Sequence, residues 1–182
     1  MLLDCSSMAK RMLFLLLFLC TSLHGTALAS TSPWVWVYST NTTSYYLNTK
    51  NCLLNNQGIE FYTIKEVYAD EVTRQNHIRV ATRLHPLQDF SDLKEEVILY
   101  ASVVMHDNNV DEYHYYQHYR YIYYYDSAGA LIAVSKGRPD YWFLLREDTF
   151  SHYIDIVARK WSIVSPDYRQ PDIDMSIARF IS

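Results

Sequence analysis

A run of tyrosines between positions 113 and 125 is the feature that most limits how this chain folds. Eight of its thirteen residues are tyrosine, and the others are two histidines, a glutamine, an arginine and an isoleucine. Aromatic residues favour strands, in which side chains alternate between two faces. Strict alternation assigns seven side chains to one face: Tyr113, Tyr115, Gln117, Tyr119, Tyr121, Tyr123 and Tyr125. The run therefore predicts a strand with one face made almost wholly of phenol rings.

Apolar and β-branched residues predict further strands on both sides of this run. We expect them at residues 34–38, 44–48, 59–68, 94–105, 131–135 and 140–145, although the length of 94–105 also allows a helix. The polar cluster HDNNVDE at 106–112 predicts a turn, so 94–105 and the tyrosine run form a hairpin. Residues 69–92 are polar and predict a variable connection with room for a short helix or strand.

One amphipathic helix is predicted near the end of the chain. In EDTFSHYIDIVARKW, residues 147–161, apolar side chains recur at steps of three and four, with Asp148 or Thr149 as the cap. That apolar stripe must pack against the sheet. The predicted fold class is α+β, a mostly antiparallel sheet of about 6–7 strands with one long amphipathic helix packed on one face.

The N-terminal residues predict a secretory signal peptide. Lys10 and Arg11 precede an apolar run at 12–20, and Ala-Leu-Ala precedes Ser30. Acidic Asp4 leaves both Met1 and Met8 as possible starts of translation. The alternative to cleavage is lipidation at Cys20, and Leu19 stands there in place of the small residue that the lipoprotein signal requires.

The chain is thereby divided into three segments. Residues 1–29 are expected to be the signal peptide, 30–165 a single domain, and 166–182 a C-terminal tail with room for a short helix. No apolar run after the leader approaches the roughly 20 residues of a membrane-spanning helix, so no transmembrane helix is expected in the mature chain.

The mature chain of 153 residues is long enough for one domain with its own core. Removing the leader moves the formal charge from -4 to -5, and an acidic domain lacks the basic face that nucleic acid requires. Cys52 is then the one cysteine left. We expect it to be a buried small apolar residue rather than half of a disulfide between two copies.

The histidines and acidic residues predict neither a metal site nor an active site. His114 and His118 share a strand face but lie about 13 Å apart, too far to chelate one ion, and His106 lies near His114 across the hairpin. Asp107 and Asp111 imitate the start of a calcium loop that lacks its glycine and its final glutamate. Nucleophile elbows, metalloprotease motifs and phosphate loops are absent from the sequence. We expect no cofactor and no enzymatic activity.

Several segments resemble a known family. The matching pieces are WVWVYST, SYYLNT, IEFYTIKEVY, YYYDSAGALIAV and the helix that leads to Trp161, which together cover most of residues 34–161. They are similar to the surface-adhesin protein E-like family of secreted bacterial proteins. The resemblance implies an α+β domain of the cell envelope or surface, with adhesins for host matrix and serum proteins among the family's members.

These observations predict an exported, non-enzymatic protein-binding domain, adhesin-like or part of the envelope, in the periplasm or at the cell surface of a bacterium. The expected partner is a host-matrix or envelope protein, or a second copy of the chain. The candidate interaction face comprises Tyr115, Tyr119, Arg120, Tyr121 and Tyr123. The competing interpretation is that these tyrosines pack under the helix. The alternative function is a periplasmic small-ligand or metal-binding domain.

Overall fold

The structure of the chain is a computed structural model that describes residues 32–108, 111–138, 140–165 and 179–181. The predicted signal peptide, with Met8 and Cys20, lies outside the described residues, as does most of the predicted C-terminal tail. The described strands and helices belong to one compact unit, which begins at Pro33.

Ten strands of this unit join in one sheet. Their bounds are β1 Trp34–Ser39, β2 Thr43–Asn48, β3 Leu53–Leu54, β4 Ile59–Tyr68, β5 Leu93–Asp107, β6 Glu112–Asp126, β7 Leu131–Lys136, β8 Tyr141–Leu145, β9 Ile163–Val164 and β10 Arg179–Ile181. Two helices accompany them, α2 at Glu71–Leu84 and α3 at Phe150–Trp161.

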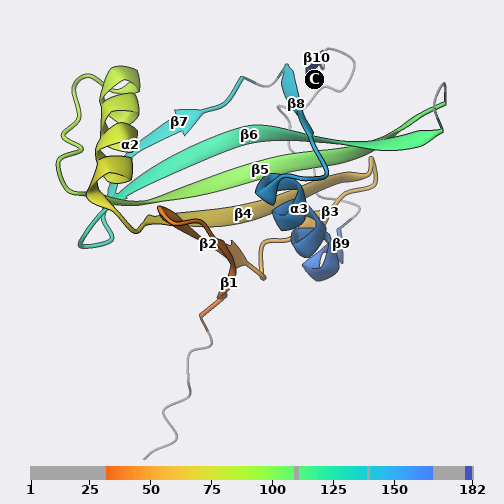
Figure 1. Cartoon of the computed structure of the whole chain (residues 1–182), viewed down its shortest axis with the longest axis horizontal. Helices are drawn as coiled ribbons and strands as arrows, with labels where there is room; N and C mark the ends of the chain where they lie inside the picture. Colours follow the sequence, from red (N-terminus) through yellow and green to blue (C-terminus); the bar gives the residue numbers. More distant parts are fainter. Residues whose placement is uncertain (1–31, 109–110, 139, 166–178, 182) are drawn as a thin grey trace, which may run out of the picture. The chain divides into compact units, whose positions relative to one another are not determined.

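The sheet is mostly antiparallel, as predicted. Its main path runs β1-β2-β4-β5-β6-β8-β10, and β3, β7 and β9 pair beside it. The long strands β4, β5 and β6 lie side by side at its centre (Figure 1). Only β8 with β10, and β3 with β9, pair in parallel among the described strands. The strands absent from the prediction, β3, β9 and β10, have two or three residues each, too short for any hydrophobic period to show.

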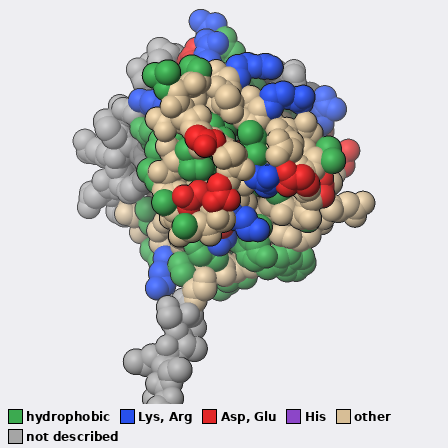
Figure 2. Space-filling model, turned by 90° about the vertical axis from the view of Figure 1, so that its left-hand side faces the viewer, with side chains coloured by type: hydrophobic (Ala, Val, Ile, Leu, Met, Phe, Trp, Pro, Cys, Tyr) green, Lys and Arg blue, Asp and Glu red, His purple; other side chains and the backbone are tan. Residues whose placement is uncertain are grey.

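The prediction of one long amphipathic helix near the C-terminus is confirmed in part. The helix α3 begins where expected, with Thr149 as its cap, but α2 is longer and fills the segment interpreted as a variable connection. The Asp70 side chain accepts a hydrogen bond from the Thr73 amide and so caps α2. Only Ala81 is buried along α2, so its sequence carries no strong apolar stripe. Seen from the end where α2 lies, the surface shows acidic and basic side chains side by side (Figure 2).

Both helices pack on the same face of the sheet, which we call the helix face. Its core below α3 combines Ile154 and Ala158 with strand residues that include Tyr62, Ile64 and Tyr100. Below α2, Ala81 packs with Phe90, Leu93, Tyr68 and Tyr124. The side chains that alternate with these strand residues point to the other side, the opposite face, where Ile59, Phe61, Ala101, Val103 and Trp142 form a third cluster. Cys52 is fully buried, as expected.

The tyrosine strand β6 contains an irregularity that changes which face its side chains occupy. Leu99 pairs with Tyr121 while the next residue, Tyr100, pairs with Tyr119. Arg120 is therefore an extra residue without a partner position on β5, which is a β-bulge. Beyond a one-residue bulge, the alternation of side chains is reversed.

Gly137 lies directly against this bulge. Its amide donates a hydrogen bond of 3.0 Å to the Arg120 carbonyl. A Cβ atom at position 137 would lie 1.7 Å from the Tyr119 carbonyl oxygen. Only glycine allows the chain after β7 to approach the bulge so closely.

We expect Gly137→Ala to destabilise the protein by about 3 kcal/mol, because the clash is with backbone and cannot be relieved by a side-chain rotation. Gly129→Ala is the matched control. Gly129 has open space around it but a positive φ of 79°, so its loss should cost about 1–2 kcal/mol. Urea unfolding of the three proteins measures both values, and equal stability of Gly137→Ala and wild type would contradict the expectation.

Candidate functional site

The bulge separates the residues predicted to form one interaction face. Tyr115 and Tyr119 pair with Val104 and Tyr100 and lie on the helix face. Tyr121 and Tyr123 pair with Leu99 and Val97 and lie on the opposite face. The prediction of one continuous phenol face was therefore wrong, because strict alternation fails at position 120.

Arg120 does not form part of any exposed rim. Its side chain is only 2% exposed, and its guanidinium lies 5.9 Å from the centre of the Tyr121 ring. An extra residue in a strand is commonly directed out of the regular pleat, and here it is directed into the protein. The positive charge of Arg120 therefore lies inside the protein and acts on neighbouring buried groups.

The competing interpretation, that the helix covers the tyrosines, holds for one part of β6. The Tyr115 ring lies 4.7 Å from the His152 ring of α3, in an edge-to-face arrangement, and Arg159 lies over the same tyrosine at 5.6 Å. Tyr119 is farther along the strand and remains 40% exposed. Phe150 of α3 contacts Tyr38 and Tyr45.

A groove of about 650 Å³ opens beside the N-terminal end of α3. We call it the aromatic groove, after the rings that line it: Tyr38 from β1, Tyr119 from β6, Phe143 from β8 and Phe150 from α3. Tyr153 of α3 adjoins it, with its ring 6.0 Å from that of Tyr38. Four separate elements thus bring these rings to one place. Its polar lining includes Arg146 and Asp148.

The rings of the aromatic groove are both clustered and exposed. Tyr119 meets Phe143 edge to face at 6.1 Å, and Tyr38 stacks on Phe150 at 5.9 Å. Their exposed fractions are 40% for Tyr119, 44% for Phe143 and 40% for Phe150. Exposed rings grouped in this way are unusual on the surface of a monomer and mark interaction sites.

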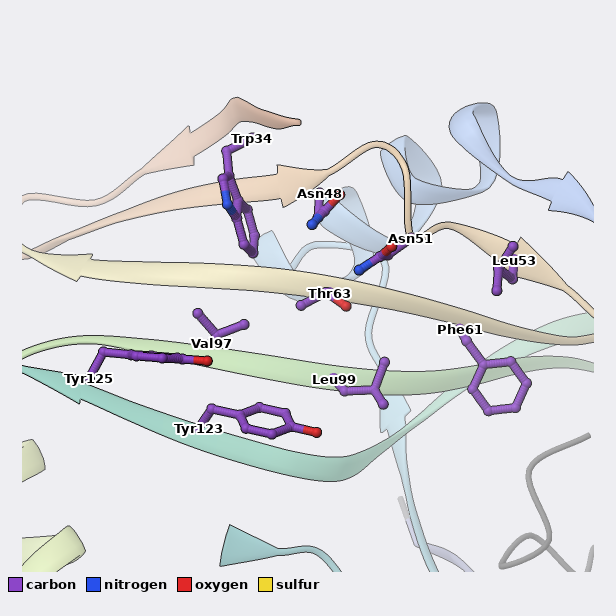
Figure 3. A pocket seen from close by; sticks show the side chains of 10 residues that line it. All are labelled: Trp34, Asn48, Asn51, Leu53, Phe61, Thr63, Val97, Leu99, Tyr123 and Tyr125. Atoms are coloured by element: carbon purple, nitrogen blue, oxygen red, sulfur yellow. The ribbon is translucent and has the colours of Figure 1, made fainter. Parts of the chain in front are cut away.

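A second groove, of about 440 Å³, lies on the opposite face (Figure 3). Tyr123 and Tyr125 line one side of it and Trp34, Asn48 and Asn51 the other, with Phe61, Thr63, Val97 and Leu99 between them. The tyrosines and Trp34 are half-buried rather than exposed. The two halves of the tyrosine run therefore contribute to two different grooves on two faces.

A buried ion cluster holds α3 in place and so positions one wall of the aromatic groove. Arg159 lies 2.8 Å from the Asp155 carboxylate and 3.4 Å from that of Glu60 on β4, and it donates a hydrogen bond to the Ser102 hydroxyl. Both carboxylates are fully buried. Burial raises the pKa of Glu60 to about 7, although Ser162 and Arg159 counteract part of this rise.

The three histidines near the hairpin occupy separate environments. His106 contacts Asn108 and Asp111, while His114 pairs with Met105. His118 is buried and donates from Nδ1 to the Tyr141 carbonyl oxygen. Burial, with the nearby charge of Arg120, lowers the pKa of His118 to about 4, so it is neutral at physiological pH. The structure does not bring these residues together.

The comparisons with known proteins give no match. Protein-family models, curated proteins and solved structures were all compared with the chain, and none resembles it significantly. The resemblance to the surface-adhesin protein E-like family stays a prediction. Among the described residues, neither α2 nor α3 has the length and apolarity that crossing a bilayer requires.

The buried Glu60 makes stability depend on pH. Its pKa is raised from 4.5 to about 7 in the folded state, so the folded protein binds a proton that the unfolded chain releases between these values. Stability should therefore fall as the pH rises from 5 to 8. Glu60→Gln should lessen this fall by about 2 kcal/mol, as measured by urea unfolding at both pH values. The exposed Glu112→Gln serves as control, and the same fall in Glu60→Gln as in wild type would contradict this assignment.

Proposed function

We propose that this chain is an exported, non-enzymatic binding module that recognises a protein partner through the aromatic groove. The observation that carries the proposal is the convergence on one groove of exposed rings from β6, β8 and α3, beside the half-buried Tyr38 of β1. Each ring comes from a different element, and a stable core alone gives no reason to leave them exposed.

The chemistry of the groove favours a protein over a small polar ligand. Tyrosine and phenylalanine bury a large area at low conformational cost, and such rings dominate the energetics of protein interfaces. Arg146 and Asp148 carry opposite charges within the lining, so the groove selects no strongly charged ligand. A segment that presents aliphatic or aromatic side chains, with polar groups at its margins, suits this lining.

The groove is also preorganised for binding. The Arg159 cluster fixes α3 against β4, and Thr149 caps the helix next to Phe150. Binding then orders few groups that were not already ordered, which lowers the entropic cost of association. The expected partners are host-matrix or envelope proteins, as the resemblance to surface adhesins implies.

The proposal is tested with the immobilised full chain and a panel of purified matrix and envelope proteins. The double variant Tyr119→Ser, Phe143→Ser should weaken capture of the bound protein about 30-fold, the effect of losing hot-spot rings. Surface plasmon resonance measures the affinity. Circular dichroism shows whether the variant is folded.

Tyr123→Ser is the matched control, because Tyr123 belongs to the same strand but lies on the opposite face. Its affinity should equal that of wild type. Loss of binding in Tyr123→Ser with retention in the double variant would refute the groove and assign recognition to the opposite face. Self-association in analytical ultracentrifugation that the double variant abolishes would identify a second copy as the partner.

A further inference from the structure

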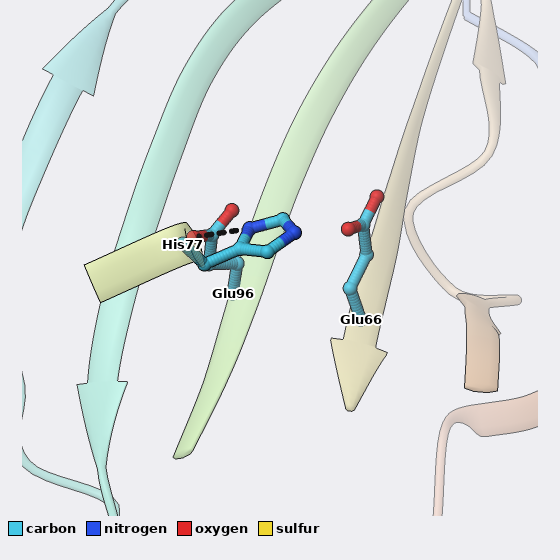
Figure 4. A group of neighbouring side chains, drawn as sticks. All are labelled: Glu66, His77 and Glu96. Atoms are coloured by element: carbon cyan, nitrogen blue, oxygen red, sulfur yellow. Dashed lines mark hydrogen bonds and ion pairs between the residues drawn. The ribbon is translucent and has the colours of Figure 1, made fainter. Parts of the chain in front are cut away.

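Three side chains that can coordinate a metal meet on the helix face, below α2. Glu66 of β4 and Glu96 of β5 are directly paired in the sheet, and His77 of α2 lies above them. One nitrogen or oxygen atom from each lies within 4.8 Å of the others. The Nδ1 atom of His77 is 3.1 Å from Glu96, and its other ring nitrogen points toward Glu66 (Figure 4).

The two carboxylates of this cluster meet one basic group, His77, which pairs with Glu96. Like charges directly opposite in a sheet are destabilising, and the Glu96 side chain is only 7% exposed. The neighbouring cations are engaged elsewhere, since Lys65 pairs with Glu95 and Arg74 with Glu71. Burial and the charge of Glu96 raise the pKa of Glu66 to about 7. The hydrogen bond to Glu96 raises that of His77.

A fourth polar group, the hydroxyl of Tyr68, belongs to the same region. Tyr68 is 92% buried, as its exposed fraction is 8%. Its ring lies 4.5 Å from that of His77. Burial, the charge of Glu96 and a hydrogen bond to that carboxylate raise the pKa of Tyr68. A carboxylate that binds a metal is commonly held by such a hydrogen bond from a neighbouring group.

We propose that Glu66, His77 and Glu96 bind a divalent transition-metal ion, with Zn²⁺ as the expected ion, and that the Tyr68 hydroxyl forms a hydrogen bond in its outer shell. A cation between the two carboxylates removes their repulsion and occupies the imidazole nitrogen that faces Glu66.

The ligand set selects the class of metal. Imidazole nitrogen suits zinc and related transition ions, whereas calcium and magnesium take oxygen ligands. Three protein ligands with one open position are also a common zinc arrangement. Ligands of one zinc ion lie about 3–4 Å apart, so small rotations of the two glutamate side chains close the site. The His77 side chain is 32% exposed, which gives an ion a path from solvent.

The test uses the untagged full chain, stripped with a chelator and then dialysed against Zn²⁺ or Ca²⁺. Metal analysis should find one zinc per chain and no retained calcium. Isothermal titration calorimetry should show zinc bound at least about tenfold more weakly by Glu66→Gln and by His77→Gln, and about tenfold more weakly by Tyr68→Phe.

Glu95→Gln and His85→Gln are the matched controls. Glu95 neighbours Glu96 but pairs with Lys65, and His85 follows α2 but contacts Ser135. Both should bind zinc like wild type. Without metal, the melting temperature of Glu66→Gln should be no lower than that of wild type, because the variant removes a repulsion. Added zinc should raise the melting temperature of wild type but not that of Glu66→Gln. Zinc absent from wild type, zinc bound equally by the glutamine variants, or calcium retained as well as zinc would each overturn the proposal.

Discussion

The structure depends on the antiparallel ladder between β5 and β6 and on the bulge at Arg120 that shifts its register. Before Arg120, β6 presents alternate side chains to α3, and after it the alternation is reversed. A single strand thereby contributes Tyr115 and Tyr119 to one face and Tyr121 and Tyr123 to the other. Gly137 makes this possible, because any side chain there would meet the backbone of the bulge. The bulge therefore decides which aromatic rings share a surface.

The helix face also carries acidic residues, and each helix brings one basic group to them. The helix α3 supplies Arg159, which contacts Glu60 and Asp155, whereas α2 supplies His77, which contacts Glu96. A guanidinium is always charged, but an imidazole is charged for only part of the physiological range. The positive charge below α3 is thus permanent, whereas the positive charge below α2 depends on pH. This difference explains why one cluster serves as an anchor and the other is suited to an ion.

The sequence predicts the larger part of the fold because two patterns are visible within a single element: alternation of side chains in a strand, and apolar residues at steps of three and four in a helix. The strands at Ile59–Tyr68 and Glu112–Asp126, and the helix that ends at Trp161, all lie where those patterns predict. The bulge escapes prediction, because its position depends on the register with β5. The helix α2 was not predicted for a different reason. It buries only Ala81, so its sequence shows no clear apolar stripe. The pairing of Glu66 with Glu96, thirty residues apart, likewise exists only once the register is fixed, although two acidic residues in apolar strands were a visible signal.

The two candidate sites share a face of the sheet but depend on different helices. The aromatic groove takes its wall from α3, whose position is fixed by Arg159, and the Glu66–His77–Glu96 cluster is completed by α2. The strands β4 and β5 connect them as rigid elements and contribute residues to both regions of the core. An ion bound below α2 would stabilise the fold by mass action.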